Sequence, residues 1–138
     1  MLDLDYKVLK ELYRSSDSLK VGDLAKILEL PHSTIGSCIK RLEEYKYVIY
    51  KRYKPVNLSK RGKDLAIEVI RHAQLMEILL YNELGLSIEE AHKESEKFNL
   101  LLSCNIINKI CEKYNHPKEC PCGELILGSQ NCRCEIHK

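Results

Sequence analysis

The 138-residue sequence lacks the features that mark several large classes of protein. Its apolar runs are only a few residues long, far below the ~20 residues that a helix needs to cross a bilayer. Residues 1–5 show neither the basic start nor the apolar stretch of a secretory signal. It also has no glycine-rich phosphate loop and no Ser/His/Asp or Cys/His constellation. We therefore expect a cytoplasmic protein that is not an enzyme and has no membrane partner.

Charge is distributed unevenly along the chain, although the net charge is only +2. Residues 1–63 hold fourteen Lys and Arg against eight Asp and Glu, a net charge of +6. Residues 64–138 hold eight against twelve, a net charge of −4. A basic surface suits contact with the phosphates of nucleic acid, but an ordinary solvated surface has the same composition. The charge alone does not separate these two interpretations.

The first sixty residues have the pattern of a winged helix-turn-helix. Apolar residues recur at helical spacing and predict helices over 3–15, 21–28 and 33–45, the last following Pro31. Residues 48–58 are rich in β-branched and aromatic side chains and predict a short two-stranded hairpin. Three helices followed by a hairpin form the winged-helix arrangement.

Two further helices are expected, one over 60–83 capped by Ser59 and one over 88–114 capped by Ser87. The first is apolar on more than one stripe, which suggests subunit contact as well as core packing. The fold class is therefore mainly α, with a two-helix dimerisation segment and an irregular cysteine-rich tail after the winged helix. The expected domains are residues 1–63 for DNA binding, 64–116 for dimerisation and 117–138 for metal or cluster binding.

The stretches 39–49 and 58–66 resemble those of winged-helix regulators, in which the third helix enters the major groove. Residues on the early, outward face of this helix and basic residues on the wing are the candidate DNA contacts. The alternative is a winged helix that binds protein. The early face of the third helix carries no Arg, Asn or Gln, so it gives no indication of which bases it would bind. The candidates are His32, Ser33, Thr34, Ser37, Lys40, Lys51, Arg52 and Lys54.

Seven cysteines are many for a cytoplasmic chain, and in a reducing compartment they indicate metal binding more than disulfides. Cys120 and Cys122 form one C-x-C pair, and Cys132 and Cys134 form another, with nine residues between the pairs. Four converging thiolates bind either a tetrahedral zinc ion or an iron–sulfur cluster. Zinc sites more often use C-x2–4-C spacing, so the pattern favours an iron–sulfur cluster, with zinc as the alternative.

Two other cysteines, Cys104 and Cys111, lie seven residues apart on one face of the last expected helix. They are additional candidate ligands, or they pack as small apolar residues. Cys38 falls on the inner face of the third helix, where we expect it to be part of the core.

The chain as a whole resembles the iron- and manganese-dependent repressors typified by the diphtheria toxin repressor. The resemblance covers residues 3–126. It depends on Asp5-Tyr6, the winged helix, Gly85-Leu86, His92, Glu96, Ser103 and the turn Cys120-Pro121-Cys122-Gly123. It implies a homodimer on a near-palindromic operator, with metal ligands on the two later helices.

The same resemblance places a residual family metal site at Asp5, Glu77, His92 and Glu96. Ala73 stands where a family histidine is expected, and Asn99 and Leu100 replace a Glu-His pair. Leucine donates no electron pair, so the main family site is interpreted as disabled. The four remaining residues are either a residual site or ordinary polar surface residues.

These observations suggest a transcription regulator, a repressor by resemblance, that senses iron, redox state or oxygen through the cysteine tail. One alternative is a constitutive DNA-binding protein with a structural four-cysteine zinc site. Another is a redox or cluster-carrier protein whose winged helix contacts protein.

Overall fold

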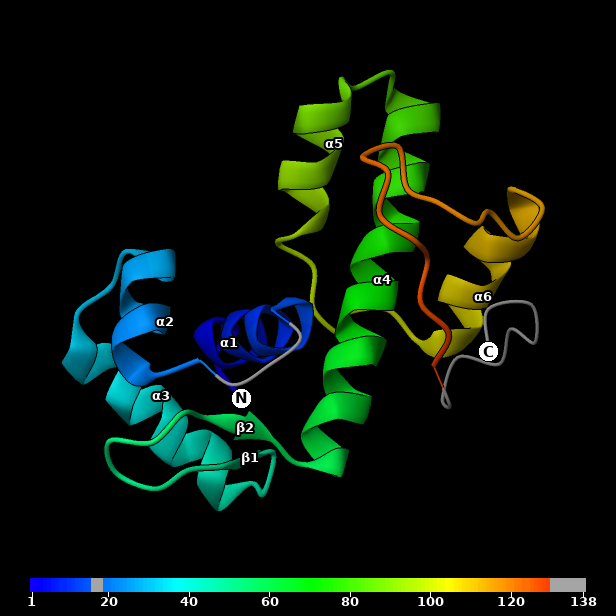
Figure 1. The fold of residues 1–138 in the computed structure, drawn as a ribbon. Coiled ribbons are helices and arrows are strands. Elements are labelled where there is room, and N and C mark those ends of the chain that lie inside the picture. Colours follow the sequence, from blue (N-terminus) through cyan, green and yellow to red (C-terminus); the bar gives the residue numbers. More distant parts are fainter. Residues whose placement is uncertain (16–18, 130–138) are drawn as a thin grey trace. The chain divides into compact units, whose positions relative to one another are not determined.

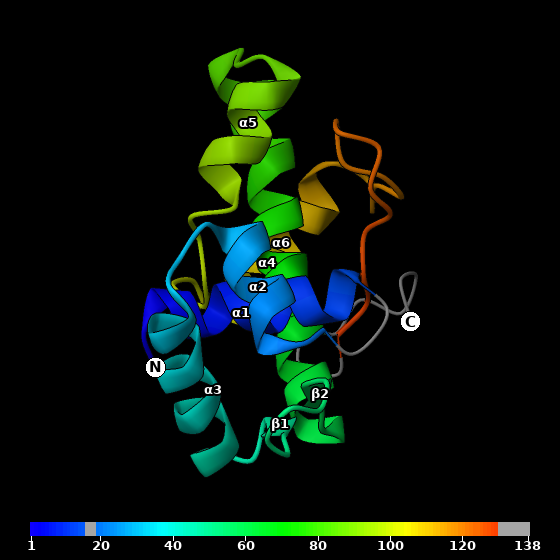
Figure 2. The same cartoon turned by 60° about the vertical axis from the view of Figure 1, so that its left-hand side comes forward.

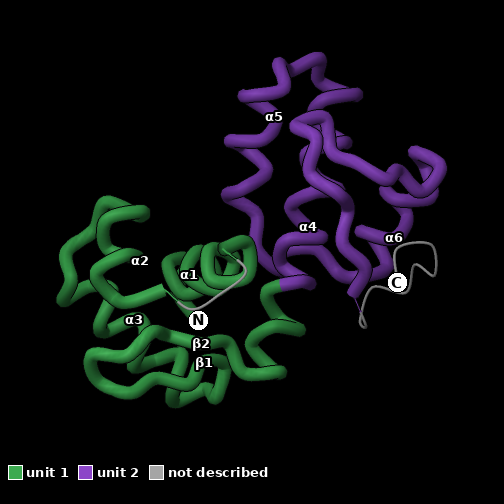
Figure 3. The backbone as a smooth tube through the Cα atoms, viewed as in Figure 1, with its two compact units in different colours: residues 1–66 green, residues 67–138 purple. Residues whose placement is uncertain are grey.

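The computed structural model describes residues 1–15 and 19–129 (Figure 1). The chain divides into two compact units, residues 1–66 and 67–138 (Figure 3). The boundary falls inside one long helix, α4 (Lys60–Leu84), which begins in unit 1 and continues into unit 2. In the described part of the chain, no helix combines the length and the apolar content that crossing a membrane requires.

Unit 1 is a winged helix-turn-helix, as predicted. It contains α1 (Asp3–Arg14), α2 (Val21–Leu28) and α3 (His32–Glu44), followed by the antiparallel strands β1 (Val48–Ile49) and β2 (Asn57–Leu58). Figure 2 shows the three helices from a second direction, with the hairpin following the end of α3. The apolar stripes that predicted the helices meet in one core. Its fully buried members include Val8, Leu9, Leu24, Ile35, Cys38, Leu42 and Val56.

The start of α4 is fixed by its cap and by a close approach to the loop between α3 and β1. Ser59 Oγ accepts a hydrogen bond from Gly62 N at 3.0 Å and donates one to Lys46 O at 2.7 Å. Ser59 therefore caps the helix, as predicted. Gly62 lies so close to the backbone of Tyr47 that a Cβ at this position would overlap the Tyr47 carbonyl.

The prediction of one helix over 88–114 is wrong, because two helices occupy this stretch. α5 (Ile88–Ser95) and α6 (Cys104–Lys113) are separated by eight residues without helical structure. Phe98 N donates to Ser95 O at 3.0 Å in a tight turn that ends α5. The expected two-helix segment after the winged helix therefore contains three helices, α4, α5 and α6.

The physical reason for the break lies in residues 96–103. Three leucines in a row, residues 100–102, fall in this non-helical stretch. The non-helical connection brings Phe98 and Leu102 against the core of unit 2 and leaves Leu101 exposed. Ser103 then restarts the helix, because its side chain accepts a hydrogen bond from Ile106 N.

The described part of the cysteine-rich tail folds into a small hairpin. Ile126 N donates to Lys118 O at 2.9 Å, and Cys120 N donates to Glu124 O at 2.8 Å. Gly123 N donates to Cys120 O at 2.8 Å and closes the turn. Gly123 has a φ of 94°, a conformation that glycine adopts without strain. The turn therefore presents the first C-x-C pair at the tip of the hairpin.

This hairpin is docked on α4 through buried polar side chains. Gln74 Nε2 donates to Glu124 Oε1 at 2.7 Å and to Leu125 O at 2.8 Å, and Leu127 N donates to Gln74 Oε1 at 2.9 Å. Arg71 Nη1 donates to Leu127 O at 3.0 Å. Cys120 and Ile126 complete the apolar core of unit 2, which also contains Leu75, Ile78, Ile107, Ile110 and Cys111.

The contact between Gly62 and Tyr47 predicts that alanine destabilises the protein at position 62 but not at position 36. We expect Gly62→Ala to lower the free energy of unfolding by about 1–3 kcal/mol or more, because the added Cβ displaces a backbone carbonyl. The matched control is Gly36→Ala in α3, where nothing lies within 4 Å of the new Cβ. That substitution should gain up to about 1 kcal/mol of helix propensity. Urea unfolding followed by circular dichroism measures both, and equal midpoints for the two variants would contradict the packing of α4 described here.

Candidate metal centre

Glu77 of α4 lies beside the tail turn that carries Cys120 and Cys122. Their potential ligand atoms, a carboxylate oxygen and two sulfurs, all lie within 4.8 Å of one another. The backbone N of Cys122 also donates to Glu77 Oε2 at 3.1 Å. Glu77 and Cys120 are buried, whereas Cys122 is exposed. The group is therefore enclosed on one side and accessible to solvent on the other.

His92 of α5 contacts the Glu77 carboxylate of this group. Its Nδ1 lies 2.7 Å from Glu77 Oε1, and its side chain is 42% exposed. Carboxylates that bind metals are commonly oriented by such an outer hydrogen-bond partner. Gln74, which anchors the tail, precedes Glu77 by three residues and so lies on the same face of α4. One helix face thus both docks the tail and presents the carboxylate to its cysteines.

The chemistry of this donor set fits a divalent metal ion. Burial raises the pKa of the Cys120 thiol, and the nearby Glu77 carboxylate raises it further. Burial also raises the pKa of Cys122, as does its hydrogen bond to Glu77. Both thiols are therefore protonated beside the carboxylate when no cation is near. A cation removes the repulsion between these groups, and binding would release the thiol protons. We refer to Glu77, His92, Cys120 and Cys122 as the Glu77 centre.

The Glu77 centre combines halves of two sites that the sequence led us to predict separately. Glu77 and His92 came from the residual family site, and Cys120 and Cys122 came from the four-cysteine cluster. Cys132 and Cys134 lie outside the described residues, so the four-cysteine cluster stays a prediction.

The other two members of the predicted residual site lie in different surroundings. Glu96 is the residue that ends α5, and within residues 1–15 and 19–129 neither group of three potential ligands includes it. Asp5 belongs to unit 1 and is fully buried. Its role as a ligand stays a prediction.

The Asp5 carboxylate binds α3 and caps α1. Arg41 Nη2 donates to Asp5 Oδ1 at 2.8 Å, Cys38 Sγ lies 3.1 Å from the same oxygen, and Leu2 N donates to Oδ2 at 2.9 Å. Burial alone would raise the pKa of this carboxyl, but the hydrogen bonds from Arg41, Cys38 and Leu2 outweigh it and lower the pKa. The positive partner of Asp5 in this structure is a guanidinium.

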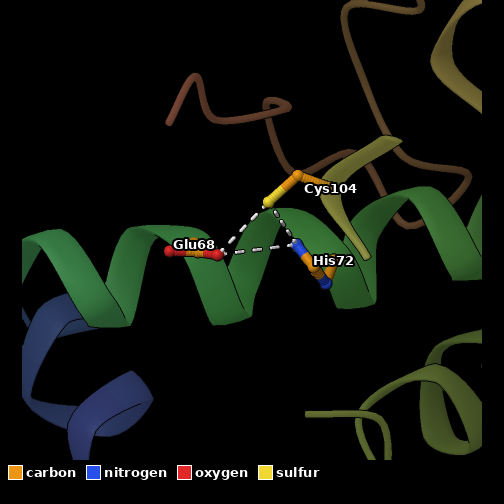
Figure 4. A group of neighbouring side chains, drawn as sticks. All are labelled: Glu68, His72 and Cys104. Atoms are coloured by element: carbon orange, nitrogen blue, oxygen red, sulfur yellow. Dashed lines mark hydrogen bonds and ion pairs between the residues drawn. The ribbon is translucent and has the colours of Figure 1, made fainter. Parts of the chain in front are cut away.

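The two additional cysteine candidates are separated from the Glu77 centre. Cys111 is buried in the core of unit 2, where its Sγ lies 3.4 Å from His116 Nδ1. Cys104 instead joins a second group with Glu68 and His72 (Figure 4). Sequence reasoning missed Glu68 as a ligand, although the four-residue spacing from Glu68 to His72 on a helix is visible in the sequence.

All the predicted DNA contacts lie on the surface of unit 1. The four early residues of α3 are exposed, as is Lys40, and so are the three basic residues of the wing between β1 and β2. Arg52 also stacks over the Tyr53 ring, with its Cζ 5.0 Å from the ring centroid. Each of these side chains is therefore available for contact, and their role in DNA binding stays a prediction.

Comparison with known proteins assigns the chain to a family. Residues 59–128, half of the chain, match the family model described as the iron dependent repressor, metal binding and dimerisation domain. The chain belongs to the iron-dependent repressor family. The matched region contains every residue of the Glu77 centre, and so the family's metal-binding domain is the part of the chain in which these donors meet.

Several members of this family are similar to the chain along most of its length. The iron-dependent repressor IdeR of Mycobacterium tuberculosis is 28% identical over 105 residues, which are 76% of this chain and 46% of that protein. The regulator MntR of Bacillus subtilis is 25% identical over 118 residues, 86% of this chain and 82% of that protein. The chain thus spans about half the length of the iron-dependent repressors it matches.

Solved structures of the family have the same fold. A manganese-dependent transcriptional repressor in complex with manganese superimposes with a TM-score of 0.82 at 27% identity, covering 92% of this chain and 60% of that one. The winged-helix repressor fold that the sequence predicted is therefore confirmed.

The Asp5–Arg41 pair predicts a pH-dependent stability in unit 1. Because the folded-state pKa of Asp5 is lowered, its contribution is fully present above the unfolded-state value of about 4 and is lost as the pH falls through the folded-state value. We expect Asp5→Asn to cost about 1.5–3 kcal/mol at pH 7, the range for hydrogen bonds to charged groups. The difference from the unsubstituted chain should shrink below about pH 4 in urea titrations. A difference that does not change between pH 7 and pH 3 would show that the carboxylate charge is not involved.

Proposed function

We propose that this chain is a metal-responsive, DNA-binding transcriptional repressor that acts as a homodimer and binds its metal at the Glu77 centre. The observation that carries the proposal is the convergence of Glu77, Cys120 and Cys122, with His92 hydrogen-bonded to Glu77, within the region that matches a metal-binding and dimerisation domain. The relatives named for iron and manganese support a divalent metal as the signal.

The mixed donor set supports a single divalent ion more than an iron–sulfur cluster. A carboxylate and two thiolates, with the His92 imidazole hydrogen-bonded to the carboxylate, suit zinc or iron(II), since sulfur ligands favour soft or borderline ions over magnesium, calcium or manganese. An iron–sulfur cluster requires further thiolates, for which Cys132 and Cys134 are the candidates. The two alternatives differ in colour and in sulfide content, and so one preparation separates them.

The DNA-binding half supports the second part of the proposal. The basic excess of residues 1–63 and the exposed residues of α3 and the wing give unit 1 a surface suited to the phosphates and the major groove. The early face of α3 carries short hydroxyl side chains and His32, and Lys40 follows one turn later. We infer that the wing lysines hold the backbone and that the start of α3 reads the bases.

Exposed apolar side chains in unit 2 support a homodimer. Leu84 is 64% exposed and Ile88 is 46% exposed, and both lie next to the connection between α4 and α5. Tyr81 is also exposed, one turn before Leu84. Exposed apolar side chains that lie close together along the chain are candidates for a surface that binds another protein. A second copy of the chain is the partner we propose, and its twofold symmetry would match a near-palindromic operator.

The position of the Glu77 centre suggests how metal would act on DNA binding. Bound there, a metal would supply a positive centre joining a carboxylate of α4 to the tail turn, with His92 of α5 beside it. α4 begins in unit 1, directly after the wing. One continuous helix therefore connects the end of the wing with the residue Glu77.

The metal centre predicts separable effects on metal and DNA binding. We expect Glu77→Ala to weaken zinc or iron(II) binding at this centre by more than the 10–100-fold that loss of an outer partner costs. The metal-dependent gain in affinity for operator DNA should disappear, whereas weak salt-dependent DNA binding should remain, because unit 1 is unchanged. Metal titration of the chelator-treated chain and gel-shift assays at fixed salt measure the two effects.

Two controls accompany this test. Glu89→Gln removes an exposed carboxylate at the start of α5 and should leave both affinities unchanged. Anaerobic purification followed by iron and sulfide analysis tests the alternative of an iron–sulfur cluster. A brown protein with stoichiometric sulfide would show that a cluster is bound in place of the single ion. The proposed regulation would be refuted if the Glu77→Ala variant and the unsubstituted chain both bound a specific operator without metal.

The DNA surface predicts a second, independent outcome. We expect Lys51→Ala on the wing to weaken DNA binding about equally for all sequences and to reduce the slope of log affinity against log salt by about one, because one phosphate contact is lost. Lys118→Ala, which removes an exposed lysine of unit 2, is the matched control and should leave the slope unchanged. An unchanged slope for Lys51→Ala would place the phosphate contacts elsewhere on unit 1.

A further inference from the structure

We propose that Glu68, His72 and Cys104 form a second metal site, separate from the Glu77 centre, that binds zinc or a similar borderline divalent ion. Glu68 and His72 lie one turn apart on α4, and Cys104 is the first residue of α6. Figure 4 shows the three side chains pointing toward one another, with the sulfur above the two α4 groups. The site would join the middle of α4 to the start of α6.

The distances between the three donor atoms match those around a zinc ion. Cys104 Sγ lies 3.4 Å from Glu68 Oε1 and 3.8 Å from His72 Nε2, and the nitrogen and oxygen are 4.0 Å apart. The point equidistant from all three atoms lies about 2.2 Å from each, close to the 2.0–2.3 Å of zinc bonds to oxygen, nitrogen and sulfur. That point is in the plane of the three atoms, so small shifts of the side chains would let a tetrahedral ion take a fourth ligand.

Burial makes this arrangement different from a chance cluster on the surface. The His72 side chain is 2% exposed and the Glu68 side chain is 12% exposed, although both are polar. A cation here would interact with the carboxylate, the imidazole and the thiolate at once. Burial also lowers the pKa of His72, which leaves its ring neutral at physiological pH, the form that binds metals.

The place of Cys104 is fixed by the start of a helix. It is the first residue of the ten-residue helix α6, whose cap is Ser103. Two side chains from one helix and one from another make a site that also constrains the fold. The site would hold the end of the non-helical connection 96–103 against α4.

The geometry of α4 keeps this site independent of the Glu77 centre. Glu68 and Glu77 are nine residues apart, two and a half turns, so they leave opposite faces of the helix about 13 Å apart along its axis. The two groups share no residue. Loss of one site should therefore leave the other able to bind a metal ion. This expectation does not depend on whether the Glu77 centre controls DNA binding.

The test uses the full chain with Cys120, Cys122, Cys132 and Cys134 all changed to serine, which removes the thiolates of the Glu77 centre and of the predicted tail cluster. We expect this chain to bind one Co²⁺ with sulfur-to-cobalt charge-transfer absorption, and to bind Zn²⁺ in competition. Adding Cys104→Ser should abolish the charge-transfer absorption and weaken binding more than a hundredfold. Adding Cys111→Ala instead, which removes a thiol of the same helix outside the triad, should change neither.

Two further variants guard against loss of folding. Cys104→Asp, which keeps an oxygen donor at a helix start that favours it, should retain a metal ion but lose the sulfur absorption. Glu68→Gln in the otherwise unsubstituted chain should reduce the bound zinc by one ion per chain, because it keeps the side-chain shape and removes the charge. Absence of cobalt binding in the folded four-serine chain, or sulfur absorption that survives Cys104→Ser, would overturn the proposal.

Discussion

The structure of unit 2 depends on satisfying the polar side chains that α4 buries. Arg71 and Gln74 are 0% and 2% exposed, and both hydrogen-bond to the tail segment 124–127. A buried amide or guanidinium left without a partner costs about 1–3 kcal/mol or more, so α4 cannot be covered by apolar groups alone. The tail hairpin is therefore a part of the fold of this unit. Its attachment to α4 fixes the positions of the residues in the hairpin.

This attachment explains why Glu77 meets the first C-x-C pair. Gln74 and Glu77 share a helix face, and the hairpin that Gln74 holds carries Cys120 and Cys122 at its tip. The positions where the family resemblance predicts a Glu-His pair are Asn99 and Leu100, which here lie in the non-helical connection after α5. Sulfur donors on the tail thus stand beside the carboxylate that remains, and a metal bound at the proposed centre would be a softer ion than manganese.

Sequence patterns predicted the elements whose periodicity is local and strong. The helices of unit 1, the wing and α4 followed from apolar spacing and from caps such as Ser59, because these signals lie within a few residues of the structure they determine. The break at residues 96–103 did not, since it depends on where Phe98 and Leu102 find the core. Resemblance identified Glu77 and His92 and spacing identified the cysteines, but neither showed that they meet, because the docking of the tail on Gln74 is a long-range contact.

Apolar residues lie on several sides of α4, and the structure explains them differently from the sequence. The sequence indicated that several stripes need several partners and that one of them is another subunit. Within unit 2 the middle of α4 already has partners on more than one side, since α6 packs against Leu75 and Ile78 and the tail hydrogen-bonds to Gln74. The exposed apolar residues of this helix lie instead near its C-terminal end, where Leu84 precedes Ile88 of α5. We therefore place the contact of the proposed homodimer at the α4–α5 corner, which leaves the middle of α4 to hold the tail and the two groups of potential metal ligands.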